Sequence, residues 1–307
     1  MSDTALDNPG VMSPVEDGQP PKVLRFVIVS DTHNRHDELG TLPDGDVLLH
    51  AGDWSTQGTV QEEEEFRTWI LALPHRHKVF VNGNHERVMR QSSKEQIRQR
   101  FPGCTYLEDD GCEIEGVRLF GSPWCDVGAY FARGSDAAAK WAAIPEDTHV
   151  LITHLPPEGV RDLAIEPFVS RSHAPPPPPA EWNVPKEVTA GRPRIDLMSA
   201  IRARLPEEVD PTTVRCVLCG KTHRDRQHWG GPELRQRVAI LRPVVHVFGH
   251  VHEDSGFESH DGTLFLNAAS YDHLREGAFI MDLEVSTDAG GAPRVSVVGS
   301  PHRQKIC

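Results

Sequence analysis

The sequence predicts an α/β sandwich with a mixed sheet at its core. The first half of the 307-residue chain alternates short apolar runs with helix-like segments, and its C-terminal part is rich in strands. Short apolar runs that end in turn-type residues are typical of strands buried on both faces. Five of these runs end in Asp, His or Asn. Packing does not require polar residues at five strand ends, so these ends also indicate a functional site.

The elements follow from local patterns. The expected strands are the apolar runs Leu24–Ser30, Asp46–His50, Lys78–Val81, Cys104–Leu107, Cys112–Glu115, Val117–Phe120, His149–Thr153, Val244–Phe248, Phe257–His260, Thr263–Asn267, Ala278–Glu284 and Arg294–Val298. The expected helices are Val60–Leu73, Glu86–Arg100, part of the Ala-rich Val127–Ala143, Ile195–Leu205 and Pro232–Leu241. The first helix has apolar residues at helical spacing and acidic residues in its first turn, which complement the helix dipole.

Composition bounds the function. Hydrophobic residues make up 38% of the chain and charged residues 25%, which suits a globular protein with an ample core. The net charge of −13 argues against general nucleic-acid binding, which needs a basic face. A small anionic substrate is compatible with it, because bound cations can reverse the local field. No apolar run approaches the roughly 18 residues of a membrane span, so we expect no membrane association.

The chain is expected to form one domain over residues 22–300. Residues 1–21 are rich in Pro, Asp, Gly and Ser and predict a disordered leader rather than a secretory signal, and residues 301–307 form a tail. A Pro-rich insertion at about 160–230 has too few apolar residues for a core of its own. It contains Pro175–Pro179, a candidate segment for binding a partner. Without a signal, the six cysteines are expected to be reduced thiols in a cytoplasmic protein.

The polar residues at the strand ends are candidate metal ligands. They are Asp31, His33, Asp53, Asn84, His154, His250 and His252. Oxygen and nitrogen donors without thiolate suit divalent Mn, Fe or Zn. Seven donors are too many for one tetrahedral ion, but they fit two ions about 3.5–4 Å apart if one carboxylate bridges them. Two such ions lower the pKa of a shared water and stabilise negative charge on a phosphoryl group. His85 is expected to point past the metals, where it can protonate the leaving oxygen or hydrogen-bond the phosphate.

These residues resemble the motifs of the calcineurin-like metallophosphoesterases. The matching blocks are Asp31-x-His33, Gly52-Asp53, Gly83-Asn84-His85-Glu86, His154 and Gly249-His250-x-His252. Every ligand position of the family pattern is filled, in the right order, over about 22–300 apart from the insertion. Further stretches, such as Thr153-His-Leu-Pro-Pro157, resemble the metallophosphoesterase-domain-containing proteins. That subgroup is known for phosphodiesterase activity, including on cyclic nucleotides.

The resemblance implies an αββα fold, in which helices flank a sandwich of two mixed β-sheets. It also implies a distribution of ligands. One metal takes Asp31, His33, Asp53 and His252, and the other takes Asp53, Asn84, His154 and His250. Asp53 is then the bridge, a metal-bridging hydroxide attacks phosphorus, and His85 is the catalytic imidazole. Some relatives have Gly in place of His250 and are weak enzymes, so the histidine here predicts fuller activity.

The family pattern is not followed everywhere. In the protein phosphatases of the superfamily an Asp-Arg-Gly block follows Gly-Asp, whereas Trp54-Ser-Thr-Gln-Gly58 follows it here, which disfavours phosphoprotein substrates. The predicted function is a dinuclear metal-dependent phosphodiesterase acting on a small phosphoester such as a nucleotide or cyclic nucleotide. The alternatives are a phosphomonoesterase or nuclease of the same superfamily, or a catalytically weak metal-binding interaction module.

Several further residues have competing interpretations. Cys216-x-x-Cys219 with His223 and His228 has the ingredients of a zinc site. The three-residue gap from Cys219 to His223 is shorter than the corresponding gap in common zinc fingers. We therefore prefer the interpretation that the two cysteines are unconnected thiols. Because they follow a ligand pair, Asn34, Arg35 and His36 are expected to reach substrate oxygens. His50 and His246, inside strands, are expected to pack or to orient the ligands.

Overall fold

The computed structural model of the chain describes residues 21–165, 216, 218–221, 226–288 and 291–304. The expectations for the leader, for Pro175–Pro179 and for a helix over Ile195–Leu205 therefore lie outside the described residues.

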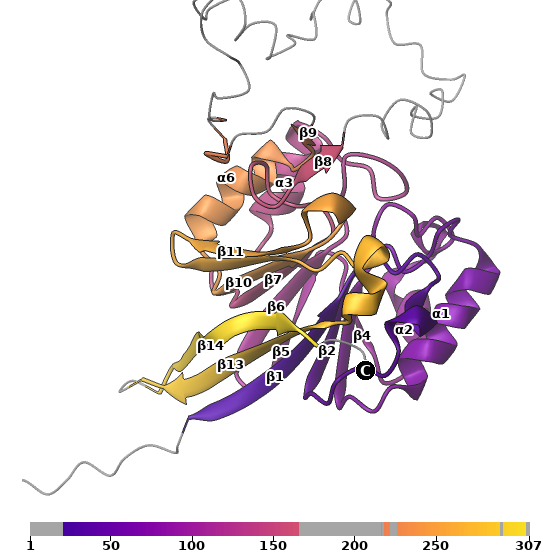
Figure 1. Ribbon diagram of the computed structural model, residues 1–307, viewed down its shortest axis with the longest axis horizontal. Helices are drawn as coiled ribbons and strands as arrows, with labels where there is room; N and C mark the ends of the chain where they lie inside the picture. The colour runs from indigo at the N-terminus through magenta and orange to yellow at the C-terminus, as the bar shows by residue number, and fades with distance from the viewer. Residues whose placement is uncertain (1–20, 166–215, 217, 222–225, 289–290, 305–307) are drawn as a thin grey trace, which may run out of the picture.

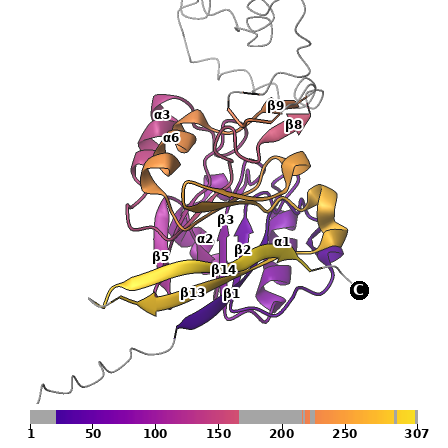
Figure 2. The same cartoon turned by 60° about the vertical axis from the view of Figure 1, so that its left-hand side comes forward.

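The first sheet has six strands in the order β14-β13-β1-β2-β3-β4. They are β1 (Lys22–Val29), β2 (Val47–Ala51), β3 (His77–Val81), β4 (Thr105–Tyr106), β13 (Phe279–Thr287) and β14 (Pro293–Arg303). Strands β1 to β4 pair in parallel, and β13 pairs antiparallel with both β1 and β14. Figure 2 shows β13 and β14 as a long hairpin along this edge of the molecule.

The second sheet has six strands in the order β11-β12-β10-β7-β6-β5. They are β5 (Asp110–Ile114), β6 (Val117–Ser122), β7 (Val150–Thr153), β10 (Val245–Phe248), β11 (Gly256–His260) and β12 (Thr263–Asn267). Its four inner strands run parallel, and β5 and β11 close its edges antiparallel. Two short strands, β8 (Leu163–Ile165) and β9 (Arg226–His228), pair antiparallel as a separate ribbon.

Helices cover the outer face of each sheet, which confirms the predicted αββα sandwich (Figure 1). They are α1 (Val60–Ala72), α2 (Lys94–Arg100), α3 (Ser135–Ala142) and α6 (Pro232–Leu241). Successive residues of a strand face opposite sides of the sheet. In β1, Phe26 and Ile28 therefore join the core between the sheets, whereas Val27 and Val29 pack in the layer that holds Phe66 of α1. A third apolar cluster joins α3 and α6 to the second sheet.

The predicted helix over Glu86–Arg100 is wrong in its first half. A short 3-10 turn, Met89–Gln91, comes first, and α2 begins only at Lys94. Ser93 explains this start, because its side chain accepts a hydrogen bond from the Gln96 N–H while the Gln96 side chain accepts one from the Ser93 N–H. The residues from Glu86 to Val88 are therefore not helical. They belong to a loop at the site described below.

The last strand is longer than the sequence pattern indicated. β14 continues to Arg303, three residues beyond position 300, where the tail was expected to begin. Arg303 donates a hydrogen bond to the Gly277 carbonyl at 2.7 Å, which fixes the end of the strand against the neighbouring loop. The edge of the first sheet therefore includes the start of the expected tail.

Candidate metal centre

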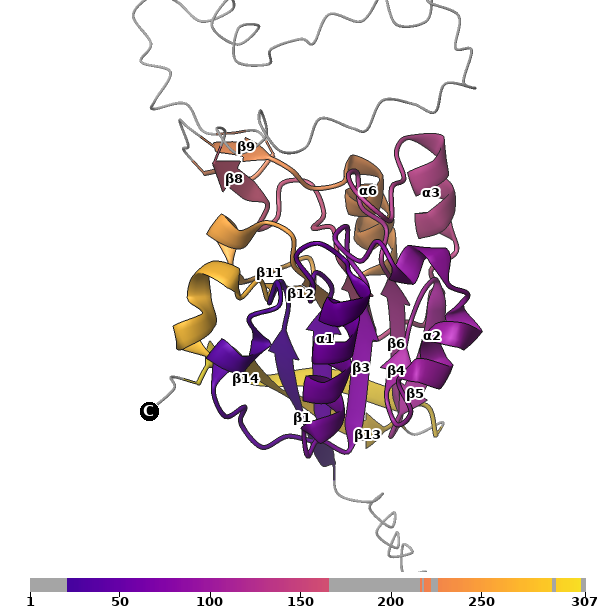
Figure 3. The ribbon, with the colours of Figure 1, turned by 90° about the vertical axis from the view of Figure 1, so that its right-hand side faces the viewer.

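The seven predicted ligand residues all follow the carboxyl ends of parallel strands. Asp31 and His33 follow β1, Asp53 follows β2, Asn84 follows β3, His154 follows β7, and His250 and His252 follow β10. β1 to β3 are neighbours in the first sheet, and β7 and β10 are neighbours in the second. Figure 3 shows β1 and β3 running toward the end of the molecule where β8 and β9 lie. The structure brings all seven side chains together there, with His85 beside them.

The strand-end loops have an unusual backbone. Asp31, His33, Asp53 and His250 have φ angles between 42° and 69°, in the left-handed region. Among residues other than glycine, Asp, Asn and His enter this region most readily. The Asp31 N–H donates to the Gly52 carbonyl at 2.9 Å, and the His33 N–H donates to the Asp53 carbonyl at 3.0 Å. The loops after β1 and β2 are thus joined, and both carboxylates face the same space.

Two glycines permit the close approach of these loops. A Cβ on Gly83 would collide with the Asp53 carboxylate, and a Cβ on Gly249 would collide with the Asp31 carboxylate and the Ser30 side chain. The glycines of the Gly-Asn-His-Glu and Gly-His-x-His blocks are therefore needed for space around the two carboxylates, beyond any need for a turn.

Three imidazoles are held in one tautomer. The Nδ1 atoms of His33, His85 and His154 lie 3.0, 2.6 and 2.9 Å from the backbone carbonyl oxygens of Ser55, Thr56 and Ala51. A carbonyl oxygen only accepts, so each Nδ1 carries the hydrogen and a neutral ring presents the lone pair of Nε2. All three Nε2 atoms face the site. This is the orientation that a metal-binding imidazole requires.

The Asp53 carboxylate lies among these Nε2 atoms. Its Oδ2 is 3.2 Å from Nε2 of His154 and 3.9 Å from Nε2 of both His33 and His85. The Asn84 amide oxygen, another acceptor, lies 2.9 Å from the same His154 nitrogen. Two acceptors at one ring nitrogen need positive charge, supplied by a proton on that nitrogen or by metal ions. The donor set therefore fits divalent cations.

The ligand atoms form two groups that meet at Asp53. Asp31, His33 and His252 make one group, and Asp53, His154 and His250 make another. Asp53 also groups with His33 and His85, so His33 links its carboxylate to the first group. Within the first group, Nε2 of His252 is 3.2 Å from Nε2 of His33 and 3.4 Å from Oδ1 of Asp31.

The charges are consistent with a cation site. Burial opposes a charge on His154, but the nearby Asp53 and Asp31 outweigh it and raise the pKa of His154 to about 10. Burial lowers the pKa of His33 and of His250 to about 4, so both rings are neutral at pH 7. A proton on His154 thus stands where bound metal would place its positive charge.

Glu86 is a functional residue to which the sequence analysis assigned no role. It is fully buried, and its carboxylate accepts hydrogen bonds from the N–H groups of Asp53 at 3.0 Å, Ser55 at 3.0 Å and Gly83 at 2.5 Å, and from the Ser55 hydroxyl at 2.7 Å. Burial and the neighbouring Asp53 raise the pKa of Glu86 to about 7. Its side chain joins the loops that carry Asp53 and Asn84. The sequence could have pointed to Glu86 through its place in the Gly-Asn-His-Glu block.

The two strand histidines contact residues beside the expected ligands. Nε2 of His50 lies 3.1 Å from the Thr32 hydroxyl, and Nε2 of His246 lies 2.9 Å from the Thr153 hydroxyl. Both rings are fully buried, and burial lowers both pKa values to about 3. These neutral rings support the loops without entering the site.

The residues after His33 do not all face the site. His36 is buried against Phe66 and Trp69, so the prediction that it reaches substrate is wrong. The reason is that the 3-10 turn His36–Leu39 packs against α1. Arg35 pairs with Glu38 and lies over the ring of Tyr271, which itself contacts the rings of His33 and His252. The Asn34 amide donates to Glu65. Arg35 is thus at the rim of the site.

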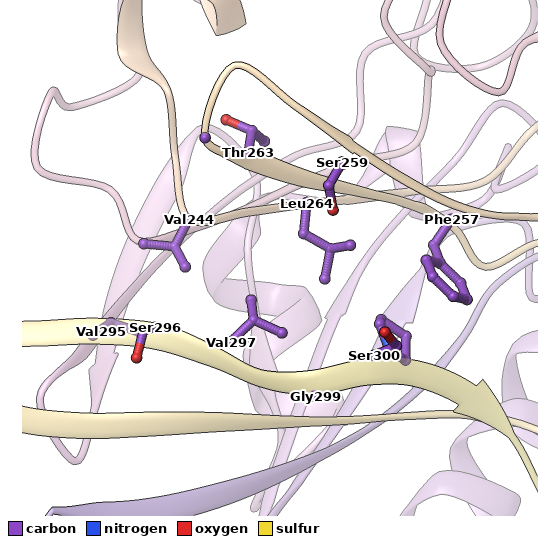
Figure 4. Close-up of a pocket in the computed structure, with 12 residues that line it drawn as sticks. Val244, Phe257, Ser259, Thr263, Leu264, Val295, Ser296, Val297, Gly299 and Ser300 are labelled. Carbon is purple, nitrogen blue, oxygen red and sulfur yellow. The ribbon is translucent and has the colours of Figure 1, made fainter.

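A separate hollow of about 400 Å³ lies where the edges of the two sheets meet (Figure 4). It is lined by Val244, Phe257, Ser259, Gly262, Thr263, Leu264, Val295, Ser296, Val297, Gly299, Ser300 and Pro301. None of these side chains is ionisable, so the hollow offers no ligands or acid–base groups for the chemistry above. None of the helices in the described part of the chain is long and apolar enough to span a membrane.

Comparison with known proteins places this site in a family. The calcineurin-like phosphoesterase family matches residues 24–254. A UPF0046 protein of Caenorhabditis elegans is 31% identical over 274 residues, covering 83% of this chain and 78% of the relative. Metallophosphoesterase domain-containing protein 1 of Homo sapiens is 29% identical over 277 residues, covering 82% of this chain and 67% of the relative. Proteins of this superfamily are metal-dependent phosphoester hydrolases. The chain belongs to the calcineurin-like phosphoesterase family.

Proposed function

We propose that this protein is a phosphodiesterase with two divalent metal ions, of which Mn, Fe or Zn are the best candidates. One observation carries the proposal: the buried Asp53 carboxylate groups with His33 in one cluster of ligand atoms and with His154 and His250 in another. Asp31, His33 and His252 would hold one ion with Asp53, and Asn84, His154 and His250 would hold the other. When bound, two such ions supply a hydroxide nucleophile near neutral pH and neutralise the phosphoryl oxygens.

His85 has the position expected of the catalytic imidazole. Its ring is held through Nδ1 by the Thr56 carbonyl at 2.6 Å, and its Nε2 faces Asp53. The His85 backbone N–H also donates to Oδ1 of Asp53 at 2.9 Å, which leaves Oδ2 toward the imidazoles. The side chain is 23% exposed, so a substrate can reach it. In its protonated form it can give a proton to the leaving oxygen.

The residue after Asp53 favours diester over phosphoprotein substrates. Trp54 is buried, its ring stacks on Phe66 with centroids 4.6 Å apart, and its indole N–H donates to Asn82 at 3.1 Å. The position is therefore occupied by a core side chain instead of one that contacts a phosphate. None of the eight side chains at the centre is Lys or Arg, so the additional charge of a monoester dianion has no cationic partner among them.

The function is tested by assaying purified protein with Mn²⁺ on a chromogenic phosphodiester and on the matching phosphomonoester. We expect metal-dependent turnover, with kcat/KM about tenfold or more higher for the diester. The reason is that one missing charge-assisted contact costs about 1.5–3 kcal/mol. A preference for the monoester would favour the phosphomonoesterase alternative. Cleavage of oligonucleotides alone would indicate a nuclease. No turnover with Mn, Fe, Zn, Co or Mg would indicate an interaction module.

Replacing His85 tests its role as an acid. The His85→Asn variant is expected to lose about 10²–10⁴-fold in kcat on a diester with a poor leaving group, because that oxygen needs a proton. The loss should be much smaller for a nitrophenolate, which leaves without one. Steady-state rates on the two diesters, with manganese content measured in the same samples, check this. His77→Asn, at the far end of β3, is the matched control. An equal loss for both leaving groups would contradict the acid role.

A further inference from the structure

A second group of metal-ligand side chains lies outside the centre described above. Cys216, Cys219 and His228 each place one ligand atom within 4.8 Å of the others. Nε2 of His228 is 3.4 Å from Sγ of Cys216. His228 is the last residue of β9, which pairs with β8, so the ribbon fixes the imidazole in front of the two thiols. Figure 3 shows this ribbon at the end of the molecule.

Two backbone hydrogen bonds close a turn around the two cysteines. The Gly220 N–H donates to the Cys216 carbonyl at 2.8 Å, and the Cys216 N–H donates to the Lys221 carbonyl at 2.9 Å. Gly220 has a φ angle of +68°, which favours glycine, and it closes the turn. Such a turn directs side chains three positions apart toward the same side. The burial of the Cys219 thiol and the proximity of Cys216 raise the pKa of Cys219.

The turn that carries the two cysteines packs against the rest of the domain. A Cβ on Gly159 would approach the Leu218 carbonyl to 3.1 Å, so this glycine leaves room for the turn to pack. Lys221 forms an ion pair with Glu258 of β11 at 3.0 Å. The thiols are therefore held next to β9 by contacts on both sides.

Asp162 orients the imidazole. It is fully buried, and its Oδ1 accepts a hydrogen bond from Nδ1 of His228 at 2.5 Å. Its Oδ2 accepts from the N–H groups of Gly159 and Gly230, both at 2.9 Å. The hydrogen of a neutral His228 ring is thereby fixed on Nδ1, and the lone pair of Nε2 faces the thiols. A carboxylate behind a metal-binding histidine is the arrangement found in zinc proteins.

We propose that Cys216, Cys219 and His228 form a zinc-binding site, with Asp162 as the positioning residue and solvent at the fourth position. Two thiolates and an imidazole are ligands that select zinc over the harder cations. The phosphoesterase centre, by contrast, consists of carboxylate, amide and imidazole groups. The site fastens residue 216 to the ribbon at 226–228. It also holds Trp229, whose N–H donates to the Asp162 carbonyl at 3.0 Å and whose ring centroid lies 6.1 Å from that of His250.

The test uses the full chain with its phosphoesterase centre first saturated with Mn²⁺. Added Co²⁺ should produce a thiolate-to-cobalt charge-transfer band, and added Zn²⁺ should abolish it. Because zinc also displaces manganese from the phosphoesterase centre, the extra zinc is counted as the difference of one equivalent between the natural chain and the variant without the two thiols. The Cys216→Ser/Cys219→Ser double variant should lose both the band and the extra zinc. The Cys104→Ser/Cys112→Ser double variant removes two thiols elsewhere and should keep both. Cys125→Ser should also keep the band, although Cys125 lies 3.7 Å from His250.

A single substitution tests the role of Asp162 without removing a ligand. Asp162→Asn is expected to weaken zinc binding by about 10–100-fold, measured by competition with a chromophoric chelator. Absence of the thiolate band in the cobalt-loaded natural chain would overturn the proposal, whatever the variants do. A disulfide between Cys216 and Cys219 that persists with zinc present would overturn it as well. Loss of the band in Cys125→Ser but not in the Cys216→Ser/Cys219→Ser variant would assign the signal to the phosphoesterase centre instead.

Discussion

The Asp53→Asn variant is expected to lose about 10³-fold or more in kcat/KM on a phosphodiester, and its manganese content should fall from two equivalents to one or fewer. An amide offers one oxygen and no negative charge, so it cannot bridge two cations as a carboxylate does. Metal ions supply several kcal/mol of transition-state stabilisation, and each 1.4 kcal/mol or so is a factor of ten in rate. Rates and elemental analysis on the same chelator-treated and manganese-reloaded samples measure both effects.

The matched control is Asp136→Asn, which makes the same substitution on the exposed first turn of α3, away from the site. It should change neither the rate nor the metal content. If Asp53→Asn still binds two equivalents of manganese, Asp53 is not the bridge. Because manganese avoids thiolate ligands, the proposed zinc site does not affect this count.

Replacing Glu86 should have the second large effect, although Glu86 is not an expected ligand. Glu86→Ala removes the acceptor of three backbone N–H groups and one hydroxyl, all buried. Each unsatisfied donor costs about 1–3 kcal/mol, part of which is recovered because a buried carboxylate is also removed. We expect a loss of about 2–4 kcal/mol in the free energy of unfolding, measured by urea denaturation of the metal-free protein.

The same variant should bind metal more weakly, because Glu86 fixes the backbone of Asp53. We expect manganese affinity to fall by about 10–100-fold under conditions where circular dichroism shows a folded chain. Glu86→Gln retains one acceptor oxygen and should fall between Glu86→Ala and the natural chain. Glu146→Ala, in an exposed loop after α3, should change stability by less than about 0.5 kcal/mol. A stable Glu86→Ala variant with unchanged metal affinity would contradict this role.

The positions of the site residues could be predicted from the sequence because their signal is local. An apolar run followed by Gly-Asp or by Thr-His identifies a strand end, and parallel strands bring their ends to one edge. Asp53 and His154 were found in this way. Their backbone conformation was not predicted, because the left-handed φ of Asp53 depends on hydrogen bonds to a neighbouring loop.

Glu86 and His228 were harder to predict because their partners are distant in sequence. The basic, polar run after Glu86 is compatible with a helix, and only the cap at Ser93 shows where the helix starts. In the same way, a zinc site at Cys216 was disfavoured by the short linear gap to His223, which lies outside the described residues. The ribbon of β8 and β9 brings His228 to the thiols instead, and no linear spacing encodes that pairing.

The ribbon of β8 and β9 has a consequence for how the protein can vary. Ile165 and Arg226 are direct cross-strand partners, so their backbones lie about 5 Å apart. A two-residue turn is long enough to close such a gap. The stretch that joins Ile165 to Arg226 can therefore differ in length without moving either strand of the ribbon. Cys216 and Cys219 lie within this stretch, so the proposed zinc site would tie it to the ribbon through His228.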